Sequence, residues 1–113
     1  MILQEEQKYE EALPFCNEGI IIEPRNIELL LNRSNLLIKT RRYDEAIQDC
    51  NQVINIDEGN ALAYYNKGCA RALMSNGEEA ISLIRKAITL DSTFHEKAKL
   101  DPDLAELRKT QIL

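Results

Sequence analysis

Apolar residues recur along the chain at two intervals, one short and one long. Five of them occupy positions i, i+1, i+4, i+7 and i+8 of a single segment: Ala46, Ile47, Cys50, Val53 and Ile54. This spacing places them on one face of an amphipathic α-helix. The same stripe starts at Ala12 and again at Ala80, at equal distances on either side of Ala46. A fixed interval of about 34 residues is typical of an array in which each unit covers the apolar face of its neighbour.

A further helix is predicted ahead of each of the two later stripes. Asn26 and Asn60 can each cap such a helix, because the side-chain oxygen of asparagine accepts a hydrogen bond from a free backbone N–H at a helix start. We therefore expect helices at about residues 27–39 and 61–75. No segment shows the alternation of a strand, so the sequence predicts antiparallel helix pairs and an all-α class.

The residues that carry the long interval resemble the tetratricopeptide repeat, a helix–turn–helix unit with the same interval. With Ile27 and Ala61 as first positions, small residues fill sites at which helices approach closely: Ser34, Gly68, Ala46 and Ala80. The family's tryptophan and one proline are missing. The resemblance covers about residues 1–94 and implies a right-handed solenoid of helix pairs.

The expected organisation is a single tetratricopeptide-like domain over residues 1–113. Its parts are a partial repeat, two full repeats and C-terminal capping helices: 1–26, 27–60, 61–94 and 95–113. Counting backwards, the first helix of the partial repeat would begin before Met1, so only Ile2–Glu6 would remain of it. The apolar run Ile20–Ile22 then lacks part of its usual cover.

The C-terminal end is expected to cap the array. A helix is predicted over Phe94–Leu100, and Pro102 interrupts it. Asp101 and Pro102 suit the cap and first position of a new helix. The spacing of Leu104 and Leu107 would lay that helix over the last repeat.

Composition narrows the classes of function. The net charge of −5 and a pI of about 4.9 oppose binding to phosphate backbones, so no nucleic-acid partner is expected. No apolar stretch approaches membrane-spanning length and no secretory signal is visible, so no membrane partner is expected. Three cysteines without metal spacing favour a reducing compartment, and the cytoplasm is the expected location.

Candidate catalytic residues are few. His95 is the single histidine, and it would need a nearby thiol to form a Cys–His pair. Cys16 and Cys50 belong to the apolar stripe, and Cys69 lies a full helix away. A zinc site would need four ligands, which these residues do not supply. We therefore expect no enzyme, no cofactor and no metal, and we expect His95 to face solvent.

The remaining candidate is a groove. In stacked helix pairs the first helices line the concave face. Applied to this chain, the family's geometry gives these groove residues: Asn32, Asn35, Leu62, Tyr65, Asn66, Cys69 and Lys99. Asn32 and Asn66 are equivalent, and each amide offers one acceptor and two donors that can hold a peptide backbone. Tyr65 would add an apolar wall with a polar tip. The alternative is that both asparagines simply face water.

Co-chaperone members of the family bind the acidic tail of heat-shock chaperones with a clamp of Lys, Asn, Asn, Lys and Arg. Residues 32–34, Asn-Arg-Ser, resemble the middle of that clamp, but Leu62 and Asn66 stand where its cations should follow. A register shifted by one unit places Leu31, Glu96 and Leu100 at cation positions. Without cations the carboxylates are not neutralised, so a neutral or partly apolar peptide is the better expectation.

The sequence therefore predicts a non-catalytic module that binds a peptide or helix segment of a partner protein. The alternative is a structural role, in which the incompletely covered Ile20–Ile22 region forms a homodimer. A hydrolase or transferase is the third alternative.

Overall fold

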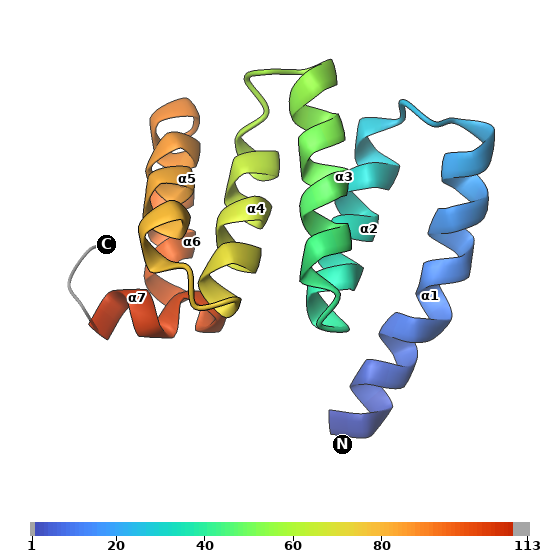
Figure 1. Ribbon diagram of the computed structural model, residues 1–113, viewed down its shortest axis with the longest axis horizontal. Coiled ribbons are helices and arrows are strands. Elements are labelled where there is room, and N and C mark those ends of the chain that lie inside the picture. The colour runs from blue at the N-terminus through green and yellow to red at the C-terminus, as the bar shows by residue number, and fades with distance from the viewer. Residues whose placement is uncertain (1, 110–113) are drawn as a thin grey trace. The chain divides into compact units, whose positions relative to one another are not determined.

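The computed structural model describes residues 2–109, and the side chains of residues 5–109. Its helices follow one another along the chain as α1 (Ile2–Ile22), α2 (Ile27–Lys39), α3 (Tyr43–Ile56), α4 (Ala61–Leu73), α5 (Gly77–Leu90), α6 (Phe94–Leu100), the 3₁₀ helix η1 (Pro102–Leu104) and α7 (Ala105–Lys109) (Figure 1). No strand occurs within residues 2–109. The all-α class built from helix pairs is confirmed, and the chain forms two compact units, Met1–Glu58 and Gly59–Leu113.

In the first unit, α2 packs against both α1 and α3. The apolar stripes meet in its core: Leu13, Leu30, Leu37, Ile38, Ala46, Ile47, Cys50 and Val53. Asn26 caps α2 as predicted, because its Oδ1 accepts a hydrogen bond from the Leu29 backbone N–H at 3.0 Å. A Cβ at Gly19 would lie 2.9 Å from Leu29 Cδ1, so the missing side chain lets α1 approach α2 closely.

One sequence expectation about α1 is wrong. The repeat pattern assigns Ile2–Glu6 to the end of a first helix and the stripe from Ala12 to a second one, whereas α1 runs without interruption from Ile2 to Ile22. Gln7 lies one repeat interval before Arg41, where the next helix pair turns, but nothing around Gln7 disfavours a helix. Pro14 lies inside α1, which bends between its two halves in Figure 1.

Both later turns use the same backbone device. Arg41 and Ser75 lie one interval apart and have positive φ values of 65° and 63°. Each follows the C-cap of its helix, Thr40 for α2 and Met74 for α4. The left-handed conformation ends the helix and returns the chain antiparallel. Because α4 ends at Leu73, it is two residues shorter than predicted.

In the second unit, α4 packs against α5, and α6 packs against α5. Its core is lined by small and branched residues together with one tyrosine: Ala63, Tyr65, Cys69, Ala70, Ala80, Ile81, Ile84, Ala87, Ala98, Leu104 and Leu107. Asn60 caps α4 through the Ala63 N–H at 3.0 Å, as predicted. Asn76 caps α5, because its Oδ1 accepts a hydrogen bond from the Glu79 backbone N–H at 3.4 Å, and its side-chain N–H donates to the Glu79 carboxylate at 3.1 Å.

The C-terminal segment follows the predicted plan up to the last described residue. The Asp101 side chain caps η1 by accepting from the Asp103 N–H at 3.0 Å, and Pro102 opens that short helix. Leu104 and Leu107 are both buried, and η1 contacts α4. The part of the predicted cap at residues 110–113 lies outside the described residues. None of the helices in residues 2–109 combines the length and apolar character that a membrane span needs.

Candidate peptide-binding surface

The outward face of α2 carries a row of polar side chains. Asn32 and Asn35 are both exposed and lie three residues apart, so they stand on one side of the helix. Glu28 and Lys39 extend the same row towards the helix ends, and both are exposed. Leu31 is half-buried beside them. The first unit thus presents two amides, flanked by one carboxylate and one ammonium group, on the predicted binding face.

The equivalent face of α4 is mostly buried. Tyr65 is 1% exposed, Cys69 is 4% exposed and Asn66 is 8% exposed, while Leu62 is half-buried. The apolar wall expected of Tyr65, like the groove position expected of Cys69, is therefore not exposed to solvent here, and the assignment of both residues to a groove stays a prediction. The physical reason is that the C-terminal segment of the same unit contacts both side chains.

Tyr65 is held by groups that come from α6 and the turn after it. Its hydroxyl donates a hydrogen bond to Asp101 Oδ2 at 2.7 Å. Its ring lies 5.0 Å from the Phe94 ring at an interplanar angle of 32°, and Lys97 Nζ lies 5.0 Å from its centroid. Burial, and then the hydrogen bond to the Asp101 carboxylate, raises the pKa of Tyr65 above its ordinary value.

Cys69 joins the same cluster. Its sulfur lies 3.9 Å from Asp101 Oδ2, and burial followed by the nearby Asp101 charge raises the pKa of its thiol. Cys69, Asp101 and Asp103 each place a ligand-type atom within 4.8 Å of the others, a grouping that the sequence analysis did not find. Both Asp101 oxygens already accept hydrogen bonds, from the Tyr65 hydroxyl and the Asp103 N–H. The geometry is therefore that of a capped turn.

The other candidates fall on the surface. Lys99 is exposed and lies 3.3 Å from the Glu96 carboxylate on the same helix, so its charge is partly neutralised by a neighbour. His95 is exposed, as expected. Cys50 is fully buried, and Cys16 is partly buried on α1.

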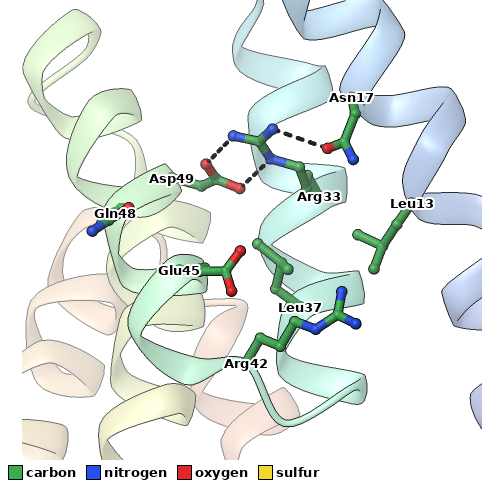
Figure 2. A pocket seen from close by; sticks show the side chains of 8 residues that line it. All are labelled: Leu13, Asn17, Arg33, Leu37, Arg42, Glu45, Gln48 and Asp49. Atoms are coloured by element: carbon green, nitrogen blue, oxygen red, sulfur yellow. Dashed lines mark hydrogen bonds and ion pairs between the residues drawn. The ribbon is translucent and has the colours of Figure 1, made fainter.

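A pocket of about 130 Å³ lies within the first unit between α1, α2 and α3 (Figure 2). Arg33 reaches from α2 and forms a bidentate ion pair with Asp49 of α3, at 2.8 Å from Nε and 2.7 Å from Nη2. Its Nη1 also donates to Asn17 Oδ1 of α1 at 3.1 Å. The hydrogen bonds with Asp49 raise the pKa of Arg33, although burial opposes the rise.

Arg33 therefore joins three helices at once. In the sequence, Arg33 stands out only as part of a clamp-like run, and no local signal pairs it with Asp49, which lies 16 residues further along the chain. At the rim of the pocket, Arg42 pairs with Glu10 at 2.9 Å, and both side chains are exposed. With its guanidinium committed to Asp49, Arg33 is engaged in holding the helices together.

A family model described as tetratricopeptide repeat matches residues 3–65, which is more than half of the chain, and a second with the same description matches residues 61–94. The chain belongs to the tetratricopeptide repeat family. No curated protein matches the sequence. The resemblance that the sequence suggested is thus confirmed for this tetratricopeptide repeat protein.

Solved tetratricopeptide repeat domains have the same fold. The domain of Arabidopsis OM64 superposes with a TM-score of 0.75 at 23% identity, covering 96% of this chain and 84% of that one. The second domain of human RPAP3, in complex with the HSP70 peptide SGPTIEEVD, gives 0.71 at 28% identity over 95% and 84%. The first domain of Spaghetti (RPAP3), bound to the HSP90 peptide SRMEEVD, gives 0.73 at 25% identity over 93% and 79%.

The Tyr65 contact predicts how stability depends on alkaline pH. Because the pKa of Tyr65 is higher in the folded chain, its contribution is fully present below the unfolded value of about 10 and is lost as the pH rises above it. Urea unfolding would be measured at pH 8 and at pH 11. We expect the free energy of unfolding to decrease less between these two pH values for Tyr65→Phe than for the native chain. Tyr64→Phe, at the half-buried neighbour, is the matched control and should keep the native loss. Equal pH dependence in all three proteins would contradict the assignment.

Proposed function

We propose that this tetratricopeptide repeat protein is a non-catalytic interaction module, and that the outward face of α2 binds a peptide segment of a partner protein. The observation that supports this most strongly is the exposed pair Asn32 and Asn35 on the predicted binding face. Side-chain amides can both donate to and accept from a peptide backbone, so they hold an extended segment with little dependence on its sequence.

The solved relatives support the same class of function. The RPAP3 domains are 25% and 28% identical to this chain, and their structures contain bound HSP90 and HSP70 peptides. Both peptides end in Glu-Glu-Val-Asp. Both the relationship to these domains and the exposed amides of α2 therefore support a peptide partner for this chain.

An acidic tail is nevertheless a poor fit to α2. Arg33 is occupied by Asp49 and Asn17, and Glu28 adds a negative charge to the exposed row. Lys39 is the cation that this face offers at its C-terminal end. We propose a neutral or partly apolar peptide whose backbone contacts Asn32 and Asn35 and whose apolar side chain contacts Leu31.

The test is a peptide selection followed by a matched pair of variants. Peptides selected on the native chain would be measured by fluorescence anisotropy, with SRMEEVD as the acidic comparison. We expect the Asn32→Ala/Asn35→Ala variant to bind the selected peptide about tenfold more weakly, as for the loss of one or two hydrogen bonds. Its melting should be almost unchanged, because both residues are exposed.

The matched control is Asn51→Ala/Asn55→Ala, which removes two exposed amides from α3. This variant should retain the native affinity. Equal affinities in all three proteins, or equal losses in both variants, would move the site away from α2. Tighter binding of SRMEEVD than of any neutral peptide would contradict the proposed class of ligand. Asn66, which the sequence placed on the groove, is a weaker test because its burial would mix folding with binding.

A second candidate function is self-association through α1. Phe15 and Ile22 lie seven residues apart on one face of α1, and both are exposed, with Ile22 79% exposed. Apolar side chains exposed together mark an interface more often than isolated ones do. On this proposal, light scattering at about 100 μM, a concentration at which weak dimers form, gives a dimer mass for the native chain and a monomer mass for Phe15→Glu. Leu100→Glu, at an equally exposed leucine elsewhere, should remain dimeric. A monomeric native chain would contradict this function.

A further inference from the structure

The end of the second unit contacts α4 much as a ligand would. We call residues 101–109, which comprise η1 and α7, the C-terminal strap. The Asp101 carboxylate accepts the Tyr65 hydroxyl at 2.7 Å. Leu104 is fully buried, and η1 contacts α4. Leu107 Cδ2 lies beside Gly77 of α5, 3.4 Å from where a Cβ would stand, which is an ordinary van der Waals distance.

The three anchoring side chains have a regular spacing. Asp101, Leu104 and Leu107 stand at i, i+3 and i+6, which brings them to one side of a short helical segment. The strap therefore shows what the α4 and α5 surface accepts. It takes a carboxylate at the start of a helical turn, followed by two leucines.

The strap is also attached in a way that allows release. Its helices have three and five residues, and helices of that length do not persist without tertiary contacts. The strap contains no cysteine, so no disulfide can tie it to the rest of the unit. Arg108 links it to the end of α6 by donating to the backbone oxygens of Ala98 and Asp101. Segments of this kind open locally at lower cost than a helix core.

We propose that the α4 and α5 surface is a second protein-binding site, which the strap occupies and thereby closes. Its partner is a helical segment of another protein that carries an aspartate and leucines three and six residues after it. The Tyr65 hydroxyl binds the aspartate, and the surface of α5 beside Gly77 contacts the second leucine. This site is separate from the α2 surface, and it stands or falls independently of the function proposed there.

The test uses a variant of the full chain in which the strap is held less tightly, called the loosened chain. Leu104→Ser/Leu107→Ser removes the two apolar anchors and leaves α4, α5 and Tyr65 unchanged. The probe is a fluorescent peptide with the sequence of residues 99–109. We expect it to bind the variant at least tenfold more tightly than it binds the native chain, in which the tethered strap competes at high effective concentration.

Three controls make the result specific. A probe with Asp101→Asn should bind the loosened chain about fivefold more weakly, because a charged acceptor forms the stronger hydrogen bond. Adding Tyr65→Phe to the loosened chain should abolish that preference for aspartate. Adding Asn32→Ala/Asn35→Ala should leave binding of the probe unchanged, which separates this site from α2.

Several results would overturn the proposal. Equal affinity of the native and loosened chains would show that the strap does not close a site. If the loosened chain retained its helical circular dichroism but did not bind the probe, the α4 and α5 surface would not be a binding site. Loss of cooperative unfolding in the loosened chain would show that the second unit cannot fold without the strap, so that the strap cannot be displaced by a partner.

Discussion

Replacing Gly68 with leucine is expected to lower the free energy of unfolding by about 3 kcal/mol. A Cβ at this position would lie 2.6 Å from Ile84 Cδ1 and 2.9 Å from Ile84 Cγ1, both well inside van der Waals contact. Ile84 is fully buried in the packing between α4 and α5, so it cannot move aside without disturbing its neighbours. Urea denaturation followed by circular dichroism measures the loss.

Alanine at each of two glycines, Gly68→Ala and Gly19→Ala, provides a comparison in which a single methyl group is added. The nearest atom to a Cβ at Gly19 is Leu29 Cδ1 at 2.9 Å, and Leu29 is only half-buried. The end of that leucine can shift towards solvent, so Gly19→Ala should cost less than Gly68→Ala. If leucine at position 68 left the unfolding midpoint unchanged, α4 and α5 could not pack as the structure has them.

Replacing Arg33 with alanine is expected to destabilise the first unit by about 3 kcal/mol, at the lower end of the range for breaking a buried ion pair. Asp49 is only 3% exposed and would lose both of its hydrogen bonds to the guanidinium. The same change frees Asn17 on α1, so the contact that joins three helices disappears. Thermal and urea unfolding both measure the effect.

Two further variants identify the cause of that loss. Arg42→Ala removes a cation whose partner Glu10 is exposed, so it should change stability by less than about 1 kcal/mol. Arg33→Leu/Asp49→Leu removes both charges together and should recover much of the loss, because no buried carboxylate is left unpaired. If the double variant were as unstable as Arg33→Ala, lost packing would be responsible.

The local signals in the sequence predicted much of the fold. Asn26 and Asn60 marked the starts of α2 and α4, and the two side-chain caps are present. The small residue at Gly68 marked the close approach of α4 and α5. These predictions succeeded because each depends on residues within one repeat interval of one another. The assignment of residues 1–26, 27–60, 61–94 and 95–113 to one domain stays a prediction.

The candidate site was less predictable because its features depend on contacts distant in the sequence. The family's geometry placed Tyr65 and Cys69 on an open face, but it gave no sign that Asp101, 36 residues after Tyr65, would fold back onto them. The pairing of Arg33 with Asp49 spans only 16 residues, but neither residue is unusual in its local context, so no local signal indicated that they would pair. Asn32 and Asn35 lie on a face of α2 that no other part of residues 2–109 buries, so both side chains are exposed. Their place in the helix was enough to predict that exposure.

The most direct test of the proposed function is a nuclear magnetic resonance titration of the native chain with a selected neutral peptide. The side-chain amide signals of Asn32 and Asn35 report contact at α2, and those of Asn51 and Asn55 report on exposed amides of α3. We predict that the chemical shifts of the Asn32 and Asn35 signals change as peptide is added and level off with the dissociation constant measured by anisotropy. The signals of Asn51 and Asn55 should not move. Saturable binding that leaves Asn32 and Asn35 unshifted would contradict a peptide-binding surface on α2.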